Sequence, residues 1–566
     1  MPSNPPISLL WPPDAHHQPR RLSDSVAADL DLDRIITALS AGYEDYTRDI
    51  RAILLDLCDD PRVIAYRQDV LADLLDDPDL ARRLDDLLPT NIELDRFHYA
   101  ARHGQTDLHE VLWRIGQLES YVETVEGLHA VFEGTRVQSA GLRQLHDLVV
   151  GVRADETFQH LLADLPEMVR KVRNIGSITL GINLDDRLRP VEATLLSINA
   201  ETFGGDMGGP SFLEMLFGWT SDRREWSGIA PLHTVKRAME QAQAGPHARD
   251  LANPMLHPLF RDLADILKQT SRPVARALQR YNHTKTQFLG ALKSELAFFL
   301  GAARLVQRLA DSGLPVCAPE IASQARRVCT ITGVYNVGLA LRLLEGRDGR
   351  LNGAVITNDT HFGDETGRIF ILTGPNQGGK TTFTQAVGIA QVLAQAGLHV
   401  PGRAACLSPV DSVYTHFPVE EAPESGAGRL GEEAQRLNDI FARATAHSLI
   451  LLNESLSSTS AGESLYLARD IVRILRRLGT RAVFATHLHD LAAGVDDLNA
   501  STPGDSEIVS LVARMHEDGA MRQTYEIAPG PPRGRSFARE IAARYGISYE
   551  QLDDLLRRRG LAHDAE

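Results

Sequence analysis

Residues 371–383 combine the residue types that bind phosphate groups in proteins. The stretch ILTGPNQGGKTTF joins an apolar run to the spacing GxxxxGKT, and a pattern typical of a helix follows. Glycines let such a loop wrap until its backbone N–H groups point at phosphates, and the helix N-terminus adds positive charge. The loop is therefore predicted to bind ATP through Gly374, Pro375, Asn376, Gln377, Gly378, Gly379, Lys380, Thr381 and Thr382.

Two residues of this loop have separate predicted roles. Lys380 is predicted to neutralise the β- and γ-phosphates during phosphoryl transfer, which makes it a catalytic residue. The Thr381 hydroxyl is predicted to ligate Mg²⁺. ATP and Mg²⁺ are thus the predicted substrate and cofactor.

A second candidate follows the apolar run of SLILLNES, residues 448–455. ATPases with a phosphate loop usually carry Asp-Glu here, where the aspartate supports Mg²⁺ and the glutamate orients or deprotonates the attacking water. Glu454 fits the catalytic role. Asn453 is predicted to support the metal through a neutral oxygen, and so more weakly than an aspartate. The alternative for Glu454 is a structural carboxylate that caps the next segment.

A third candidate follows the apolar run of RAVFATHLHDL, residues 481–491. In ATPases of the ABC superclass a histidine after such a strand reaches the γ-phosphate, so His487 is predicted to be catalytic. The alternative is a structural histidine. A fourth segment, ESGAGRLGEEAQRL, residues 424–437, is glycine-rich and turns into a helix. In a dimer its helix N-terminus could dock on the partner's γ-phosphate, and the alternative is a plain surface loop.

These residues lie in a region where strand-like and helix-like runs alternate. The strand-like runs are ARRVCTITGVYNVGL, GAVITN, RIFILTG, LILLNE and RAVFAT. Alternation with helical runs predicts a mostly parallel sheet in a three-layer α/β arrangement. Residues 326–566 are therefore predicted to form an α/β P-loop ATPase domain of the ABC type with a C-terminal helical tail.

The first half of the chain has a different pattern. Apolar residues recur at three- and four-residue spacing, which predicts an all-α body over residues 26–325, with Pro61 at one helix start. GSITLGINLD (176–185) and VEATLLSINA (191–200) are predicted to be two paired strands, a small β insertion near residues 176–200. The following ETFGGDMGGPSF is predicted to be a loop. Residues 1–25, rich in proline, are predicted to be a flexible leader.

Composition limits the class of protein. The chain has 566 residues, 59 Lys and Arg and 75 Asp and Glu, which gives a formal net charge of −16. This acidic balance argues mildly against nonspecific nucleic-acid binding by the whole surface. The four cysteines form no CxxC pair, so neither a zinc site nor a disulfide framework is predicted. The absence of a long apolar run predicts no membrane span, and a reducing cytoplasm fits these features.

The motifs together resemble those of a known family. TGPNQGGKTTF, SLILLNESLSSTSAGES and FATHLHDL, in this order and spacing, resemble the ATPase domain of the MutS DNA mismatch-repair family. The tail TYEIAPGPPRGRSFAREIAARYGI, residues 524–547, resembles the segment that closes this domain. VIAYRQDVLADLLDD followed by NIELDRF resembles the family's helical core domain. The resemblance is most specific over about residues 330–550.

The resemblance implies roles for several residues. Glu454 would be the catalytic carboxylate, and His487 would sense the γ-phosphate. Val355 and Ile356 fall where the family lays side chains against adenine. Residues 424–433 would form the loop that acts across a dimer with two composite ATP sites, so a homodimer is expected. The helical body would correspond to the family's core and lever.

Three departures from the family pattern matter. The opening residues contain no Phe-x-Glu wedge motif, so the chain is expected to be a short member without the mismatch-reading domain. Asn453 replaces the expected aspartate. The family's dimer-signature serine would align near Gly428, so Ser425 or backbone amides would supply the contacts across the dimer.

Three functional hypotheses follow. The leading one is a MutS-like DNA-binding ATPase that couples ATP binding and hydrolysis to clamping or release of DNA in repair or recombination. The alternative is an ATP-gated protein-interaction scaffold that does not bind DNA directly, which the acidic balance favours. A small-molecule kinase is disfavoured because no acceptor pocket is indicated and the large helical body would have no role.

Overall fold

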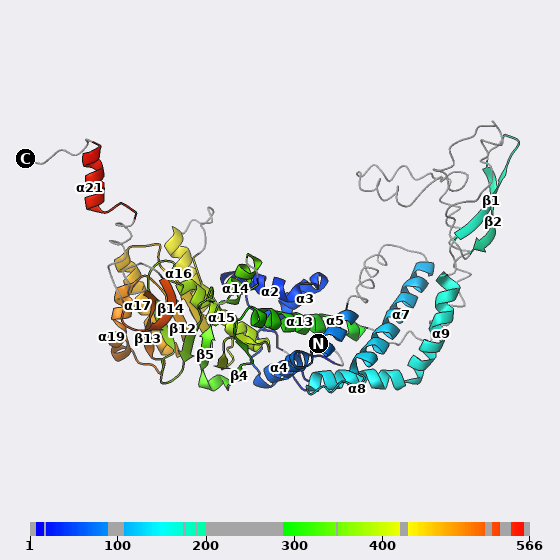
Figure 1. Cartoon of the computed structure of the whole chain (residues 1–566), viewed down its shortest axis with the longest axis horizontal. Coiled ribbons are helices and arrows are strands. Elements are labelled where there is room, and N and C mark those ends of the chain that lie inside the picture. Colours follow the sequence, from blue (N-terminus) through cyan, green and yellow to red (C-terminus); the bar gives the residue numbers. More distant parts are fainter. Residues whose placement is uncertain are drawn as a thin grey trace, which may run out of the picture. The chain divides into compact units, whose positions relative to one another are not determined.

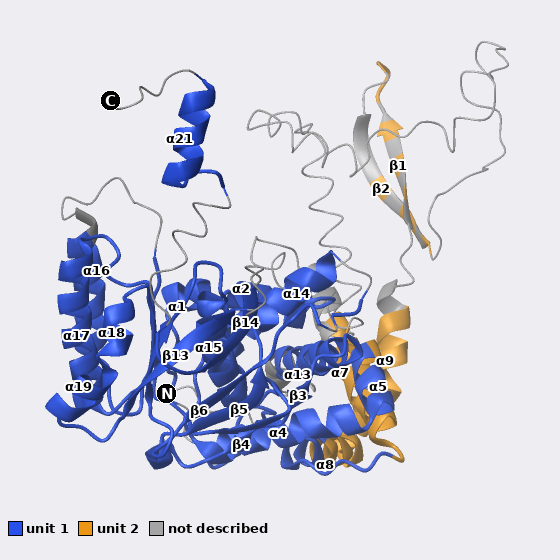
Figure 2. Cartoon of the chain, turned by 60° about the vertical axis from the view of Figure 1, so that its left-hand side comes forward, with its two compact units in different colours: residues 1–85, 135–145, 288–566 blue, residues 86–134, 146–287 orange. Residues whose placement is uncertain are grey.

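The structure, a computed structural model, divides into two compact units. It describes residues 7–15, 18–88, 107–173, 177–187, 190–199, 287–346, 349–351, 353–418, 428–515, 523–532 and 545–559. Unit 1 comprises residues 1–85, 135–145 and 288–566, and unit 2 comprises residues 86–134 and 146–287 (Figure 2). The chain is thus multidomain, and it is about half helical with mixed sheets. The predicted boundary at residues 325/326 lies inside unit 1, and the predicted domain limits stay predictions.

Helices of unit 1 come from both the N-terminal and the C-terminal parts of the sequence (Figure 1). They are α1 (Asp24–Asp29), α2 (Leu32–Ser40), α3 (Thr47–Leu54), α4 (Pro61–Asp76), α5 (Pro78–Leu87), α13 (Gln287–Asp311), α14 (Val337–Glu345), α15 (Lys380–Gln395), α16 (Gly428–Phe441), α17 (Ala461–Leu478), α18 (His489–Ala493), α19 (Val495–Ser501) and α21 (Tyr549–Arg558). The predicted helix start at Pro61 is confirmed. The Asp60 side chain caps this end by accepting the N–H of Arg62, and proline suits the first turn because it has no N–H to leave unpaired.

The main sheet of unit 1 has six strands in the order β10-β11-β12-β7-β13-β14. Their bounds are β7 (Ile369–Thr373), β10 (Val413–His416), β11 (Leu449–Asn453), β12 (Arg481–Ala485), β13 (Ile508–Met515) and β14 (Gln523–Pro529). All neighbours are parallel except β13 and β14. Every residue of β7, β11 and β12 is buried, which explains their continuous apolar runs.

Helices cover both faces of this sheet. Apolar side chains of α16, α17, α18 and α19 join alternate residues of β7, β11 and β12 in one buried cluster. Helix α15 packs on β11 and β12. Gly388 of α15 lies between Leu30 and Leu451, where an added Cβ would come within 2.7 Å of both side chains. The predicted alternation of strands and helices is therefore present in this sheet.

Several predicted strands do not belong to the main sheet. Strands β4 (Glu320–Ile321), β9 (Ala404–Leu407), β5 (Cys329–Val334) and β6 (Asn358–Phe362) form a separate four-stranded sheet in this order, and β3 (Val316–Cys317) pairs with β8 (Val400–Pro401). The predicted strand GAVITN is wrong, because residues 353–355 form a turn with Gly353 at φ +75° and the strand starts only at Asn358. The end of ARRVCTITGVYNVGL is helix α14, which Asn336 caps by accepting the N–H of Leu339.

Unit 2 contains α7 (Asp107–Phe132), most of α8 (Ala140–Ala154) and α9 (Glu156–Arg173), together with β1 (Ser177–Leu184) and β2 (Pro190–Asn199). Strands β1 and β2 pair antiparallel, which confirms the predicted β insertion. Within the unit, Tyr121 of α7 meets Phe158 of α9 edge to face, with ring centroids 5.8 Å apart. The predicted glycine-rich loop at 201–212 and the predicted helical segment from 230 to 286 lie outside the described residues.

Residues 8–10, which the sequence assigns to a flexible leader, are buried in unit 1. The Ser8 hydroxyl donates to the Glu295 carboxylate at 2.8 Å, and the N–H of Leu9 donates to the same carboxylate. The Tyr66 hydroxyl donates to the Ser8 carbonyl at 2.8 Å. Burial raises the pKa of Glu295, and hydrogen bonds to its carboxylate oppose this shift. This part of the leader is therefore ordered by a buried carboxylate on α13, while residues 1–6, 16 and 17 lie outside the described residues.

A buried arginine ties the helical part of unit 1 to helix α15. Arg67 of α4 is 1% exposed, donates from Nε to the Leu10 carbonyl at 3.0 Å and from Nη1 to the Gln395 carbonyl at 3.4 Å, and stacks over the Trp11 ring. The Gln395 side chain donates to the Cys58 carbonyl at 2.7 Å. Burial lowers the pKa of Arg67. The C-terminal end of α15 is therefore held by α4 and by the start of the chain.

Substitution of two helical glycines tests this packing. A Cβ on Gly301 of α13 would lie 2.0 Å from the Leu39 carbonyl oxygen, whereas a Cβ on Gly462 of α17 would meet nothing within 4 Å. Gly301→Ala is expected to destabilise unit 1 by about 3 kcal/mol, because a backbone carbonyl cannot give way. Gly462→Ala is expected to be neutral or to stabilise by up to about 1 kcal/mol. Urea unfolding midpoints of both variants measure this, and equal midpoints would contradict the close approach of α13 to α2.

Candidate functional site

The predicted phosphate loop connects the end of β7 to the start of α15. Gly374 (φ +147°), Gln377 (φ +62°) and Gly379 (φ +90°) have positive φ values, which turn the chain sharply between strand and helix. A Cβ on Gly374 would lie 2.6 Å from the Ala513 Cβ, so only glycine fits there. The first helical hydrogen bond joins the Phe383 N–H to the Gly379 carbonyl at 2.9 Å. The earlier amides of α15 have no acceptor within the helix and can bind an anion.

The Lys380 ammonium lies inside this loop. It donates to the carbonyls of Gly374 at 3.1 Å and Pro375 at 3.0 Å, and it lies 3.9 Å from Glu454 Oε1. Desolvation by burial lowers the pKa of Lys380, and the negative charge of Glu454 opposes this shift. A buried cation that donates hydrogen bonds to the carbonyls of its own loop is suited to receive a phosphate group.

Thr381 and Asn453, the two predicted metal ligands, contact each other. The Thr381 hydroxyl donates to Asn453 Oδ1 at 3.0 Å, and Asn453 ends β11 with 5% of its surface exposed. Among the described residues, no group of three or more His, Cys, Asp or Glu side chains could hold a metal ion. Mg²⁺ typically takes few protein oxygens and completes its shell with water and substrate phosphates. The Thr381–Asn453 oxygen pair therefore fits Mg²⁺ that arrives with a nucleotide.

Glu454 and His487 are also brought together. His487 Nε2 lies 2.8 Å from Glu454 Oε1, and the Glu454 N–H donates to the Ala485 carbonyl at 2.8 Å. Glu454 has φ +49°, an unfavourable backbone conformation for a residue with a side chain. The hydrogen bond from His487 lowers the pKa of Glu454, burial opposes this shift, and the charges of His487 and Lys380 add to it. Glu454 is thus held as an ionised carboxylate beside Lys380.

A cavity of about 420 Å³ opens beside these residues, a size typical of small-molecule sites. Its lining consists of Val334, Tyr335, Asn336, Leu339, Leu343, Ala354, Ile356, Asn358, Gln377, Gly378, Gly379, Lys380, Thr381, Thr382, Phe383, Ala386, Glu454 and Tyr525. One part is polar and belongs to the phosphate loop, and another part is apolar. The cavity therefore has the two kinds of surface that a nucleotide needs.

Of the two residues predicted to contact adenine, only one lines the cavity. Ile356 lines the cavity and is 37% exposed, whereas Val355 is 7% exposed and is not among the lining residues. The sequence did not single out the lining residues of α14 or Asn358 and Tyr525. The start of α14 could have been predicted from Asn336, because asparagine is a preferred residue at the N-terminal cap of a helix. No local signal places β14 beside the phosphate loop.

The first three residues of the predicted loop do not line the cavity. Gly374 and Pro375 supply the carbonyls that hold Lys380, and the Asn376 carbonyl accepts from Gln523 at 2.9 Å. Ser425 and the loop 419–427 lie outside the described residues. The helix that follows carries Glu433, whose carboxylate accepts the Leu456 N–H at 2.8 Å two residues after Glu454.

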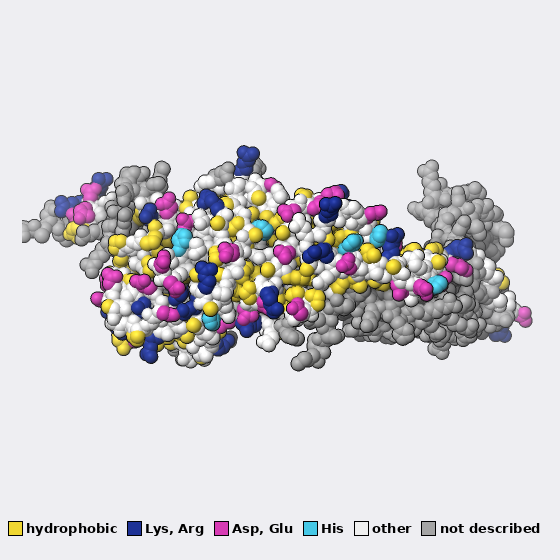
Figure 3. Space-filling view, turned by 90° about the horizontal axis from the view of Figure 1, so that it is seen from below, with side chains coloured by type: hydrophobic (Ala, Val, Ile, Leu, Met, Phe, Trp, Pro, Cys, Tyr) yellow, Lys and Arg dark blue, Asp and Glu magenta, His cyan; other side chains and the backbone are white. Residues whose placement is uncertain are grey.

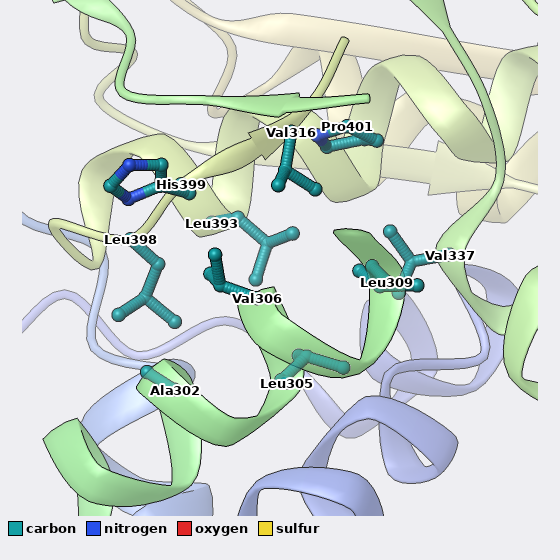
Figure 4. Close-up of a pocket in the computed structure, with 10 residues that line it drawn as sticks. All are labelled: Ala302, Leu305, Val306, Leu309, Val316, Val337, Leu393, Leu398, His399 and Pro401. Carbon is teal, nitrogen blue, oxygen red and sulfur yellow. The ribbon is translucent and has the colours of Figure 1, made fainter. Parts of the chain in front are cut away.

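A second, much smaller cavity of about 10 Å³ lies between α13 and α15 (Figure 4). Its lining is apolar apart from His399, whose pKa is lowered by burial. It is at most the size of a single water molecule, so it holds no substrate.

Comparisons with known proteins agree with this geometry. A model of the MutS2 N-terminal domain matches residues 59–312, and a model of MutS domain V matches residues 370–551. The second match contains the phosphate loop, Glu454 and His487. The chain belongs to the MutS family.

Individual relatives carry MutS names. This MutS-family chain is 26% identical over 581 residues to a DNA mismatch repair protein MutS 2 of Haloarcula marismortui, covering 97% of the chain and 56% of the relative. It is 35% identical over 193 residues to endonuclease MutS2 of Thermus thermophilus, covering 33% and 24% of the two chains. An endonuclease MutS2 of Pelotomaculum thermopropionicum is 26% identical over 412 residues, covering 69% and 48%. The chain thus spans about half or less of the length of these relatives.

The ionised state of Glu454 in this MutS-family site predicts a pH-dependent stability. Because the folded-state pKa of Glu454 is lowered, its charge adds stability above its ordinary pKa of 4.5, and this stability is lost as the pH falls through the folded-state pKa. Glu454→Gln is expected to lower the free energy of unfolding by about 1 kcal/mol near pH 7. The difference from wild type should shrink below about pH 4. Urea unfolding at both pH values measures this.

Glu526→Gln removes one negative charge from an exposed position in the middle of β14 and serves as a control for net charge. A Glu454→Gln deficit that stays constant with pH would show that the carboxylate's charge is not its source.

Proposed function

We propose that this chain is a MutS-like DNA-binding ATPase that couples ATP binding and hydrolysis to clamping or release of DNA in repair or recombination. The observation that carries the proposal is the convergence of Lys380, Thr381 and Glu454 on one cavity of about 420 Å³. Membership of the MutS family and relatives named for DNA mismatch repair support the DNA-coupled part.

ATP is the proposed substrate, with its phosphates in the loop Gly374–Thr382. Lys380 would stabilise the charge that develops during phosphoryl transfer. Glu454 would orient the attacking water and accept its proton. Because Oε1 of Glu454 already accepts from His487, the proton is assigned to Oε2. His487 would keep the carboxylate oriented and help stabilise the charge on the γ-phosphate.

Mg²⁺ is the proposed cofactor, and when bound it would neutralise charge on the β- and γ-phosphates. Thr381 and Asn453 are the residues that would hold it. Their mutual hydrogen bond of 3.0 Å keeps both oxygens in one place before the nucleotide arrives. Since Asn453 is neutral, it would bind the metal more weakly than an aspartate, and we infer that turnover is slow and the ATP-bound state long.

The proposed arrangement is an all-α core and lever body followed by an ABC-type ATPase domain, active as a homodimer in the cytoplasm. Contacts between α15 and α1 support coupling: the Gln385 side chain donates to the Asp29 carbonyl at 2.8 Å and lies 3.0 Å from Asn336 Nδ2 at the cavity. Closure of two ATPase domains around ATP would move the helical body, with residues 424–433 acting across the dimer. The four free cysteines suit a reducing compartment. In the described part of the chain, no helix is long and apolar enough to span a bilayer.

The second candidate is an ATP-gated protein-interaction scaffold that does not bind DNA directly. The net charge of −16 favours it. On the face in Figure 3, acidic and basic side chains are interspersed over the described residues. A DNA-binding surface would instead give an affinity that falls steeply with salt.

ATP hydrolysis with and without DNA tests the proposal. Wild type is expected to hydrolyse ATP slowly and to be stimulated by one of homoduplex, mismatched or branched DNA. Lys380→Ala should lose at least about 100-fold of this activity, because the charge on the transferring group is left unbalanced. Lys293→Ala on α13, outside the cavity, is the matched control and should keep wild-type turnover.

Two further results decide between the candidates. If no form of DNA changes the ATP turnover and the chain shows no salt-sensitive DNA binding, the DNA-coupled proposal is wrong. The scaffold is then the remaining candidate. Stimulation by one DNA form that Lys380→Ala abolishes would identify the preferred substrate.

Asn453→Asp tests the slow-turnover inference. The added charge is expected to lower the Mg²⁺ concentration for half-maximal activity and to raise turnover about tenfold, which corresponds to ~1.4 kcal/mol. Metal binding in the presence of a non-hydrolysable ATP analogue gives a readout independent of turnover. A variant that binds Mg²⁺ no more tightly and hydrolyses ATP no faster than wild type would contradict the inference.

A further inference from the structure

Glu454 begins a short stretch of strained backbone that follows β11. Glu454 has φ +49° and Leu456 has φ +66°, so two of the three residues 454–456 lie in the left-handed region. This conformation costs a residue with a side chain roughly 1–2 kcal/mol. Strained residues persist only where the surrounding structure holds them, and they gather at functional sites. The contacts that hold this segment therefore decide where the Glu454 carboxylate lies.

Hydrogen bonds to the backbone fix both ends of the segment. The Glu454 N–H donates to the carbonyl of Ala485, the last residue of β12, at 2.8 Å. At the other end, the Leu456 N–H donates to the Glu433 carboxylate of α16 at 2.8 Å. The Leu456 carbonyl accepts from the hydroxyl of Ser464 of α17 at 2.7 Å. Two helices and one strand thus hold the two strained residues.

The middle residue, Ser455, is held by His416, the last residue of β10. Ser455 is 4% exposed and His416 is 1% exposed. Oγ of Ser455 lies 2.7 Å from Nδ1 of His416, and the same hydroxyl donates to the His416 carbonyl at 3.3 Å. Burial lowers the pKa of His416 to about 4, the charge of Arg436 adds to this shift, and main-chain hydrogen bonds to the ring oppose it. The ring is therefore neutral near pH 7 and can hydrogen-bond to the buried hydroxyl without a buried charge.

The contact between Ser455 and His416 is not part of the cavity wall. Neither residue lines the cavity, whereas Glu454 does. The contact can thus affect the position of Glu454 without touching a nucleotide. It also links the carboxylate to the helical part of unit 1, because Thr415, next to His416, donates from its hydroxyl to Asp29 of α1 at 2.6 Å.

We propose that Ser455 and His416 are positioning residues for ATP hydrolysis, which hold Glu454 in its strained conformation with the carboxylate at the cavity. The inference rests on the proposed ATPase function and adds to it the residues that place the carboxylate. Lys380 and the phosphate loop keep their own contacts when the Ser455–His416 hydrogen bond is lost. Loss of this hydrogen bond should therefore slow hydrolysis and leave nucleotide binding intact.

ATP turnover by the full chain and its binding of a non-hydrolysable ATP analogue test the proposal. Ser455→Ala removes the hydroxyl and is expected to lower turnover at least about tenfold, because a small misplacement of a reacting group costs up to about 100-fold. Binding of the analogue should stay within about twofold of wild type, because the hydroxyl does not line the cavity. A loss of turnover without a loss of binding distinguishes positioning of Glu454 from support of the phosphate loop.

A matched pair of variants at His416 makes the same test with Ser455 in place, and it stands even if Ser455→Ala does not fold. His416→Asn and His416→Leu have nearly the same shape, but only asparagine can hydrogen-bond to the Ser455 hydroxyl. His416→Asn is expected to keep turnover within about threefold of wild type. His416→Leu should lose as much turnover as Ser455→Ala. Equal turnover in the two variants would contradict a role for the hydrogen bond.

Two controls separate positioning from stability. Ser312→Ala removes another buried hydroxyl, which donates to the Leu309 carbonyl at 2.7 Å in unit 1 outside the cavity. It is expected to lower the urea unfolding midpoint about as much as Ser455→Ala and to keep wild-type turnover. In a chain that already carries Glu454→Gln, Ser455→Ala should cause no further loss in single-turnover hydrolysis, because it acts through the carboxylate.

The remaining outcomes overturn the inference. Wild-type turnover in Ser455→Ala, or the full loss repeated in the Glu454→Gln chain, would show that Ser455 does not act through Glu454. Equal losses of turnover and of analogue binding would assign Ser455 to the support of the phosphate loop. Wild type that hydrolyses no ATP would refute the proposed ATPase function and this inference with it, whereas active wild type with active Ser455→Ala and His416→Leu refutes the inference alone.

Discussion

Burial of helix α15 is the constraint on which the rest of unit 1 depends. Thirteen of its sixteen residues are buried, from Lys380 at its start to Gln395 at its end. A helix buried this completely must find internal partners for its polar side chains. Gln391 donates to Gln395 and to the Ser408 carbonyl, and Gln395 bonds the Cys58 and Val410 carbonyls and the Val410 N–H. The phosphate loop is therefore attached to the helical part and to the sheet through one rigid element.

The burial of α15 also limits which charged groups lie near Lys380 at its start. Lys380 is 4% exposed, and its ammonium lies 3.9 Å from Oε1 of Glu454, which also contacts His487. Asn453 contributes no charge, although it occupies a position where the family resemblance predicts an aspartate. The site thus holds one lysine and one glutamate, with the neutral Asn453 beside Thr381 at the end of β11. Added negative charge from a nucleotide meets little repulsion in such a site.

Sequence reasoning reached the residues whose signal is local. The phosphate loop, Glu454 and His487 each follow a buried apolar strand, and the alternation of strand-like and helix-like runs predicted a mostly parallel sheet. The lining from α14 and β14 was missed because its position depends on contacts between distant residues, such as Asn358 with Tyr525. GAVITN was wrongly predicted to be a strand because its β-branched residues favour one, whereas a turn begins at Gly353, which has a positive φ, and the strand starts only at Asn358. The order of residues 8–10 depends on Glu295, nearly 300 positions away, which no local pattern can reveal.

Contacts between segments of unit 1 that lie far apart in the sequence also affect how the protein folds during synthesis. The segment Ser8–Trp11 packs on α4, on Glu295 of α13 and, through Arg67, on the end of α15. During synthesis the first residues leave the ribosome long before α13 and α15 exist, with the whole of unit 2 translated in between. Unit 1 therefore cannot complete its core cotranslationally until Gln395 has emerged. Until then the early helices of unit 1 lack these long-range contacts, so the order of synthesis limits when its core can form.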